Sequence, residues 1–184
     1  METPKVEPPF VDLEDLGGTD KKKILDLVRL MTEQKTYVKP STKEFGPFFV
    51  VKGNFALNVL NAVAGVGCGS EEGYPGMKKC LDTARAEDIV SSTFKLNEKV
   101  TRGDFYRALL KARNVELVDS TPEDLAAYCS DASDASEEMA RVYATAKRYR
   151  IAVRYKGDMC RLNVAFSRLE AVQFATKALG VKKK

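Results

Sequence analysis

The sequence predicts a mainly α-helical protein with one domain, and three observations lead to this fold class. The 184 residues are 44% hydrophobic and 30% charged, which is enough for one real core inside a well-solvated surface. Apolar residues recur at helical spacing in several segments, and capping residues precede most of these segments. We divide the chain into an extended N-terminal arm at 1–19, a helical domain at 20–180 with a basic C-terminal third, and a basic tail at 181–184.

The arm at 1–19 is predicted to be extended, because Pro4, Pro8 and Pro9 disfavour a helix there. Four apolar residues follow these prolines and gain nothing from exposure to water. We expect them to contact a neighbouring subunit, with packing on the chain's own core or an unpacked tail as the alternatives. These four residues are Phe10, Val11, Leu13 and Leu16.

Caps and apolar periodicity predict the helices. They are expected at 20–34, 55–64 and 77–91, from Thr101 to about 112, from Thr121, and through Met139 toward Tyr149. The start at Thr121 carries the fullest signature, because a capping residue is followed by a proline at the first helical position and then by two acids. Between the first two helices, the run at 48–51 predicts a strand-like or buried extended segment. The glycine-rich stretch at 65–76 lacks the spacing of a phosphate-binding loop and is predicted to be a surface loop.

Residues 150–165 leave two alternatives open. Apolar residues alternate on both sides of Gly157-Asp158, which predicts a small β-hairpin that places Arg154 opposite Arg161. Like charges directly opposite one another are unfavourable unless an anion lies between them, so a hairpin would indicate a ligand. In the alternative, the preceding helix continues through Tyr155 and a further helix begins a few residues later.

Several classes of function lack the residues they need. Histidine is absent, which removes Ser-His and Cys-His nucleophile pairs and most zinc sites. We expect no catalytic residues, no metal site and no cofactor, and therefore no enzyme. No stretch reaches the length of a membrane span, and the N-terminus lacks a secretory signal, so we expect a cytoplasmic protein. In that setting four dispersed cysteines are expected to be reduced and buried: Cys68, Cys80, Cys129 and Cys160.

The charge is unevenly distributed along the chain. Residues 141–184 hold twelve Lys or Arg and two acids, a net charge of +10, whereas the rest of the chain carries −6. Tyrosines alternate with arginines in this basic third, and single-stranded nucleic acid requires cations for its phosphates and flat rings for its bases. The alternative is a solvated basic helix that balances an acidic body. The predicted RNA-binding residues are Arg148, Tyr149, Arg150, Arg154, Tyr155, Lys156 and Arg161.

No family motif is recognised in the sequence. The layout of an apolar arm, a helical core and a basic aromatic stripe is similar to that of coat proteins and nucleoproteins of filamentous RNA viruses. The resemblance implies that arms link neighbouring subunits and that a basic groove holds the strand. We therefore expect a self-assembling structural protein that packages single-stranded RNA, located in the virion if this interpretation is correct. The alternative is a monomeric module that binds RNA or a protein partner.

Overall fold

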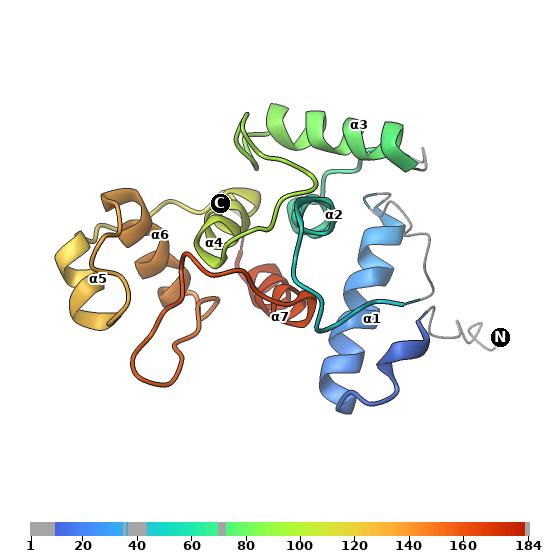
Figure 1. Ribbon diagram of the computed structural model, residues 1–184. Coiled ribbons are helices and arrows are strands. Elements are labelled where there is room, and N and C mark those ends of the chain that lie inside the picture. The colour runs from blue at the N-terminus through green and yellow to red at the C-terminus, as the bar shows by residue number, and fades with distance from the viewer. Residues whose placement is uncertain (1–9, 35, 37–43, 70–72, 183–184) are drawn as a thin grey trace.

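Seven α-helices form most of the chain that the computed structural model describes, namely residues 10–34, 36, 44–69 and 73–182 (Figure 1). They are α1 (Gly18–Glu33), α2 (Gly53–Ala64), α3 (Gly73–Ala86), α4 (Arg102–Ala112), α5 (Pro122–Tyr128), α6 (Glu137–Arg148) and α7 (Arg168–Leu179). A short 3-10 helix, η1 (Val11–Leu13), precedes them. The predicted mainly helical fold class is confirmed. None of the described helices combines the length and apolar character needed to cross a membrane.

The central helix is α2, because it is apolar on nearly every side. Its residues from Ala56 to Ala64 are all buried, and it packs against α1, α3, α4 and α7. A helix that is hydrophobic all round needs neighbours on every face. Figure 1 shows α2 end-on, with α3 above it and α1 and α7 on its other sides.

A smaller group of helices extends from this core. α6 packs on α4, and α5 packs on α6 (Figure 1). The predicted start at Thr121 is confirmed: its hydroxyl accepts from the Asp124 amide, and the Asp124 carboxylate accepts from the Thr121 amide. Thr101, Ser136 and Ser167 cap α4, α6 and α7 in the same way through their hydroxyls. Local cap chemistry therefore sets the starts of these four helices.

The boundaries of α3 differ from the prediction of a helix at 77–91. The helix begins at Gly73 and ends at Ala86, because the Ile89 amide donates to the Ala84 carbonyl while Asp88 takes a left-handed conformation with φ 52°. This is a Schellman-type ending, in which an apolar residue after the left-handed position packs back on the helix. Ile89 is buried accordingly.

The predicted β-hairpin at 150–165 is wrong, and so is its alternative of helix through this segment. The two limbs meet in a single bridge between Tyr155 and Met159, and α7 begins only at Arg168. The backbone of residues 160–164, which would form the second strand of the hairpin, forms hydrogen bonds with other parts of the chain. The Val164 carbonyl accepts from the Arg102 amide, and the Asp131 carboxylate accepts from the Cys160 and Arg161 amides at 2.7 and 2.8 Å.

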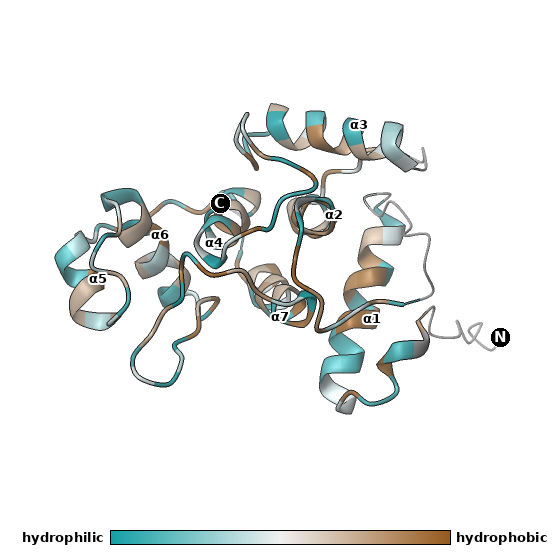
Figure 2. Cartoon of the chain, in the orientation of Figure 1, coloured by the Kyte–Doolittle hydropathy of each residue, from teal (hydrophilic) through white to brown (hydrophobic). Residues whose placement is uncertain are grey.

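The run at 48–51 is extended only in part, and it is not buried as predicted. Val51 is fully buried, but Phe48, Phe49 and Val50 are exposed. Val50 pairs with Ser167 in an isolated bridge just before α7. Figure 2 shows hydrophobic residues along this segment where it leads into α2.

The part of the N-terminal arm that is described packs on the chain itself. Phe10 and Leu13 are buried, and the Phe10 ring lies 5.4 Å from the Phe45 ring. The Asp12 carboxylate accepts from the Phe45 and Gly46 amides at 2.8 and 2.7 Å. Packing on the chain's own core was the first of the two alternatives to a subunit contact for these residues. Residues 1–9 and the side chain of Val11 lie outside the described part of the chain.

The cysteines are buried, as predicted, but the prediction that they are reduced is wrong. Disulfides join Cys68 to Cys80 and Cys129 to Cys160, whose Cα atoms lie 4.7 and 5.4 Å apart. These separations are ordinary for a disulfide. Disulfides persist mainly in oxidising surroundings, so they weigh against the predicted cytoplasmic location, which stays a prediction.

Candidate functional site

An open hollow of about 630 Å³ lies where the C-terminal ends of α6 and α7 meet the end of the chain. Three of the predicted RNA-binding residues line it. Four further residues join them from α7 and the segment after it. The complete lining is Arg148, Tyr149, Arg150, Lys177, Gly180, Val181 and Lys182.

The end of α6 sets the position of the two arginines. The Arg150 amide donates to the Lys147 carbonyl, and the Ile151 amide donates to the Ala146 carbonyl, which together form a Schellman motif. Arg150 therefore occupies the left-handed position, with φ 59°, where glycine is usual. The motif turns the chain sharply, so Arg148, Tyr149 and Arg150 all reach the hollow.

Arg113 at the end of α4 holds the opposite wall. Its Nε donates to the Val181 carbonyl at 3.1 Å, and its Nη2 donates to the same oxygen. Its Nη1 donates to the Val63 carbonyl at 3.3 Å. These bonds fix the backbone just before Lys182 and bring a further positive charge close to the hollow.

The four cations of the hollow lack acidic partners in the described part of the chain. Arg148, Arg150 and Lys177 line it together with Lys182, and none of them forms an ion pair with a described carboxylate. Two helix C-termini contribute roughly half a negative charge each, and cations there have a purely structural use as dipole partners. Four full positive charges still exceed that negative charge about fourfold. The hollow is therefore electropositive and suited to an anion.

The pKa of Lys177 is lowered, but by groups other than the remaining cations of the hollow. Partial burial lowers the pKa of its ammonium group, and the positive charge of Lys23 on α1 lowers it further. Lys23 itself pairs with Asp20 at 3.4 Å. The sequence suggested phosphate contact for the lysines at 21–23 only as the weaker alternative to a solvated face, and the structure places one of them close to the hollow.

The other predicted RNA-binding residues lie on the segment between α6 and α7, and most have partners within the chain. Arg154 pairs with Asp158 at 2.5 Å and lies 4.3 Å from the centre of the Tyr128 ring. The Arg161 guanidinium lies 4.8 Å from the centre of the Tyr155 ring. Lys156 is exposed at the tip of the segment. The structure thus brings Arg148, Tyr149 and Arg150 together in the hollow without the remaining four.

Tyr155 belongs to a half-buried polar cluster. Its hydroxyl accepts from Arg102 Nε at 2.7 Å and donates to Glu170 Oε1 at 2.5 Å, and Arg102 pairs with the same carboxylate at 2.8 Å. Burial and the bond to Glu170 raise the pKa of Tyr155 to about 12. Burial favours a higher pKa for Glu170, but hydrogen bonds from Tyr155, Arg102 and the Ser167 amide outweigh it and lower the pKa. The cluster ties α4 to α7, so its role is structural.

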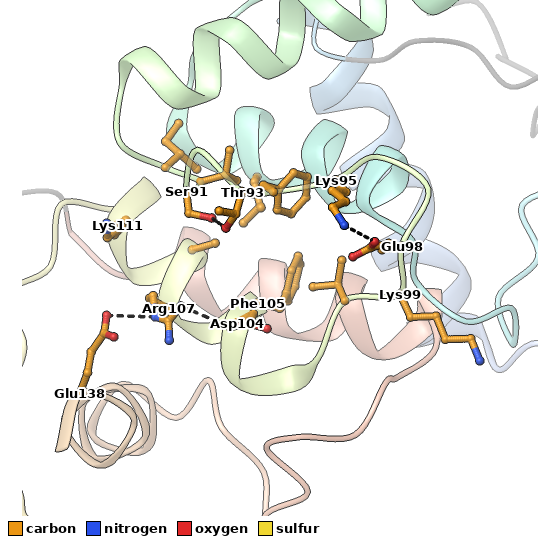
Figure 3. A pocket seen from close by; sticks show the side chains of 16 residues that line it. Ser91, Thr93, Lys95, Glu98, Lys99, Asp104, Phe105, Arg107, Lys111 and Glu138 are labelled. Atoms are coloured by element: carbon orange, nitrogen blue, oxygen red, sulfur yellow. Dashed lines mark hydrogen bonds and ion pairs between the residues drawn. The ribbon is translucent and has the colours of Figure 1, made fainter. Parts of the chain in front are cut away.

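A second hollow, of about 370 Å³, lies between α4 and residues 89–100 (Figure 3). Leu60, Val100 and Phe105 contribute to its apolar lining. Opposite charges neutralise one another around its rim. The ion pairs are Lys95–Glu98 at 2.6 Å, Arg107–Asp104 at 3.3 Å, Arg107–Glu138 at 3.1 Å and Lys111–Asp88 at 2.9 Å. Among the lining cations, only Lys99 lacks an ion pair with a described carboxylate, so the rim carries little net charge.

Comparison with known proteins adds no relative. No protein-family model matches the chain, and a search of the curated proteins finds no match. The functional assignment therefore depends on the residues at the ends of α6 and α7 that line the basic hollow.

Sequence reasoning missed Lys177 and Lys182 as partners of Arg148 and Arg150. Both lysines are in the basic third, so composition placed them in the correct segment. Lys177 is in the last turn of α7, where a cation is explained equally well by the helix dipole. Only the hollow that the ends of α6 and α7 share distinguishes the two roles.

Proposed function

We propose that the chain binds single-stranded RNA through the basic hollow and that it is a structural protein which packages RNA. One observation carries the proposal: four cations surround an open hollow of about 630 Å³, and none has a described carboxylate partner. Phosphate contacts supply most of the affinity of proteins that bind nucleic acids without sequence preference.

The composition of the hollow favours a nucleic acid over a small inorganic anion. Tyr149 lies among the cations and is half-buried, so its ring is held in place while part of it remains accessible. Bases of single-stranded RNA stack on such rings, whereas a phosphate ion gains nothing from them. The hollow is also far larger than a single phosphate requires.

Binding of a fluorescent single-stranded RNA, followed by anisotropy at several salt concentrations, tests this function. Four phosphate contacts predict a slope of about −2.8 in log affinity against log salt, so a fourfold rise in salt weakens binding about 50-fold. Arg148→Glu and Lys177→Glu should each weaken binding. The matched control is Lys78→Glu, a change at an exposed lysine of α3 outside the hollow. Equal losses in all three variants would reduce the effect to net charge and contradict the site.

Self-assembly is the second part of the proposal. It is supported by the similarity of layout to coat proteins and nucleoproteins of filamentous RNA viruses. Because Phe10 and Leu13 are buried in the chain itself, a test that removes them would also damage the core. Deletion of residues 1–9 avoids this problem. Loss of large RNA-bound species in light scattering after the deletion supports assembly through the arm; an unchanged small species in both proteins favours the monomeric RNA-binding module.

A further inference from the structure

Exposed hydrophobic side chains gather beside the N-terminal end of α7. Phe48 is 73% exposed, Phe49 57%, Val50 43% and Val164 48%. The Arg168 amide donates to the Phe49 carbonyl, and Val50 pairs with Ser167, so these residues lie around the first turn of α7. Two neighbouring phenylalanines at such exposure are unfavourable in water, which marks a contact surface.

Two lysines face each other directly on the same segment. Lys52 and Lys99 form an isolated antiparallel bridge. The flanking bonds run from the Gly53 amide to the Glu98 carbonyl and from the Val100 amide to the Val51 carbonyl, at 3.0 and 3.1 Å. This pattern defines a non-hydrogen-bonded pair, in which the Cα atoms are about 4.5 Å apart and the side chains are at their closest.

The repulsion between these lysines is not relieved within the described part of the chain. Both are exposed, and neither forms an ion pair with a described carboxylate. Figure 3 shows the Lys99 side chain extending away from the paired charges of the second hollow, including Lys95 and Glu98. Like charges directly opposite in a ladder destabilise it, so an anion between them is the favourable completion.

The aromatic and basic parts of this surface belong together. Val50 and Lys52 are two residues apart in an extended segment, which places their side chains on one side of it. Phe48 and Phe49 directly precede them, and the Arg168 guanidinium lies 5.6 Å from the centre of the Phe49 ring. We define the strand platform as Phe48, Phe49, Val50, Lys52, Lys99 and Val164.

We propose that the strand platform is a second contact for single-stranded RNA, in which bases stack on Phe48 and Phe49 while a phosphate lies between Lys52 and Lys99. This inference rests on the proposed function. Exposed rings beside unpaired cations match a strand that offers flat bases and phosphates alternately.

The platform and the basic hollow lie at opposite ends of α7. Phe49 and Arg168 are at its first turn, whereas Lys177 is in its last turn. A helix of 12 residues is about 18 Å long, so one nucleotide does not reach both contacts. Each surface is therefore open to separate mutation.

Anisotropy with a fluorescent 12-nucleotide oligo-U RNA tests the platform on the full chain. Base stacking on an aromatic ring predicts that Phe48→Ser weakens binding about fivefold or more. The double variant Lys52→Gln, Lys99→Gln should weaken binding and reduce the slope of log affinity against log salt by about 0.7, because the two lysines share one phosphate. The matched control is Tyr74→Ser on α3, because Tyr74 is also 73% exposed and should leave binding unchanged. Circular dichroism checks that each variant folds. If Phe48→Ser does not fold, the lysine double variant still tests the platform.

The outcomes separate the inference from the proposed function. If the unmodified chain binds no RNA, the proposed function and the platform both fail. If Arg148→Glu weakens binding while the Phe48 and lysine variants bind as the unmodified chain does, the platform alone is overturned. If Phe48→Ser lowers the sedimentation coefficient and leaves RNA affinity unchanged, the platform is an interface between copies, and the inference is likewise overturned.

Discussion

Arg150 offers a substitution that should separate stability from RNA binding. It occupies the left-handed position after α6, with φ 59°, and both hydrogen bonds of the Schellman motif are present. Its side chain lines the basic hollow without an ion pair to a described carboxylate. Arg150→Gly therefore removes a strained side chain from the fold and a cation from the hollow in one step.

The magnitudes follow from these two roles. A non-glycine residue in the left-handed region costs about 1–2 kcal/mol, and the greater freedom of glycine in the unfolded chain offsets about 0.5–1 kcal/mol of the gain. The free energy of unfolding should therefore rise by about 0.5–1 kcal/mol, which raises the melting temperature by about 2 °C in a chain of this size. RNA affinity should fall about fivefold at low salt, and the salt slope should become shallower by about 0.7.

Urea unfolding followed by circular dichroism gives the first quantity, and anisotropy with single-stranded RNA gives the second. Arg150→Lys keeps the charge and the strain, so it should change neither stability nor affinity greatly. Asn114→Gly is the control for the backbone, because Asn114 holds the same position after α4 with φ 52° and carries no charge. An Arg150→Gly variant that binds RNA as tightly as the unmodified chain would refute the role of Arg150, and a loss of stability above 1 kcal/mol would refute the strain.

Three further predictions concern the fold. Glu170→Gln leaves the buried Arg102 without its counter-charge, which should cost about 3 kcal/mol at pH 7. Because the fold lowers the pKa of Glu170, the stability that its carboxylate contributes is present above the unfolded pKa and is lost as pH falls through the folded pKa. The urea midpoints of the variant and the unmodified chain should therefore converge below about pH 4. A constant difference between them down to about pH 3 would contradict this. Thiol titration of the unreduced protein in guanidinium should find no free cysteine, and four titratable thiols would disprove both disulfides. Reduction should lower the free energy of unfolding by about 4 kcal/mol for the disulfide with 31-residue separation and by about 3 kcal/mol for the one with 12-residue separation. Gly53→Ala should destabilise by about 2–3 kcal/mol because its Cβ would lie 2.1 Å from the Lys95 carbonyl oxygen. Gly18→Ala, with no atom within 4 Å, should unfold at the same or a slightly higher urea concentration.

The parts of the fold that the sequence predicted are those determined by neighbours along the chain. Thr121, Pro122 and Asp124 form their cap within four residues, so the start of α5 was readable from the sequence. The buried face of α1, which includes Ile24 and Met31, follows from helical spacing alone. Local signals of this kind gave the helical fold class and most helix starts.

The parts that were missed depend on contacts between distant segments. Alternation of apolar residues between Ile151 and Val164 favoured a hairpin. Instead, the Val164 carbonyl accepts a hydrogen bond from Arg102, which is 62 residues away in the sequence. The disulfides join residues 12 and 31 apart, and no spacing motif marks such pairs. In the basic hollow, Lys177 lies with Arg148 because the ends of two helices line the same space. Periodicity reports the faces of one element and says nothing about which ends meet.

Two departures from ordinary stability rules coincide at the basic hollow. A compact fold usually separates unpaired like charges, since their repulsion destabilises it, yet four cations face this one space. A Schellman motif usually takes glycine at its left-handed position, yet Arg150 stands there. By contrast, Arg154 and Arg161 of the same basic third have partners in the chain, although Arg161 also takes a left-handed conformation, with φ 53°. Sites where a protein forgoes stability in two independent ways are characteristic of function, so the hollow is a stronger candidate than the high charge of the segment alone would make it.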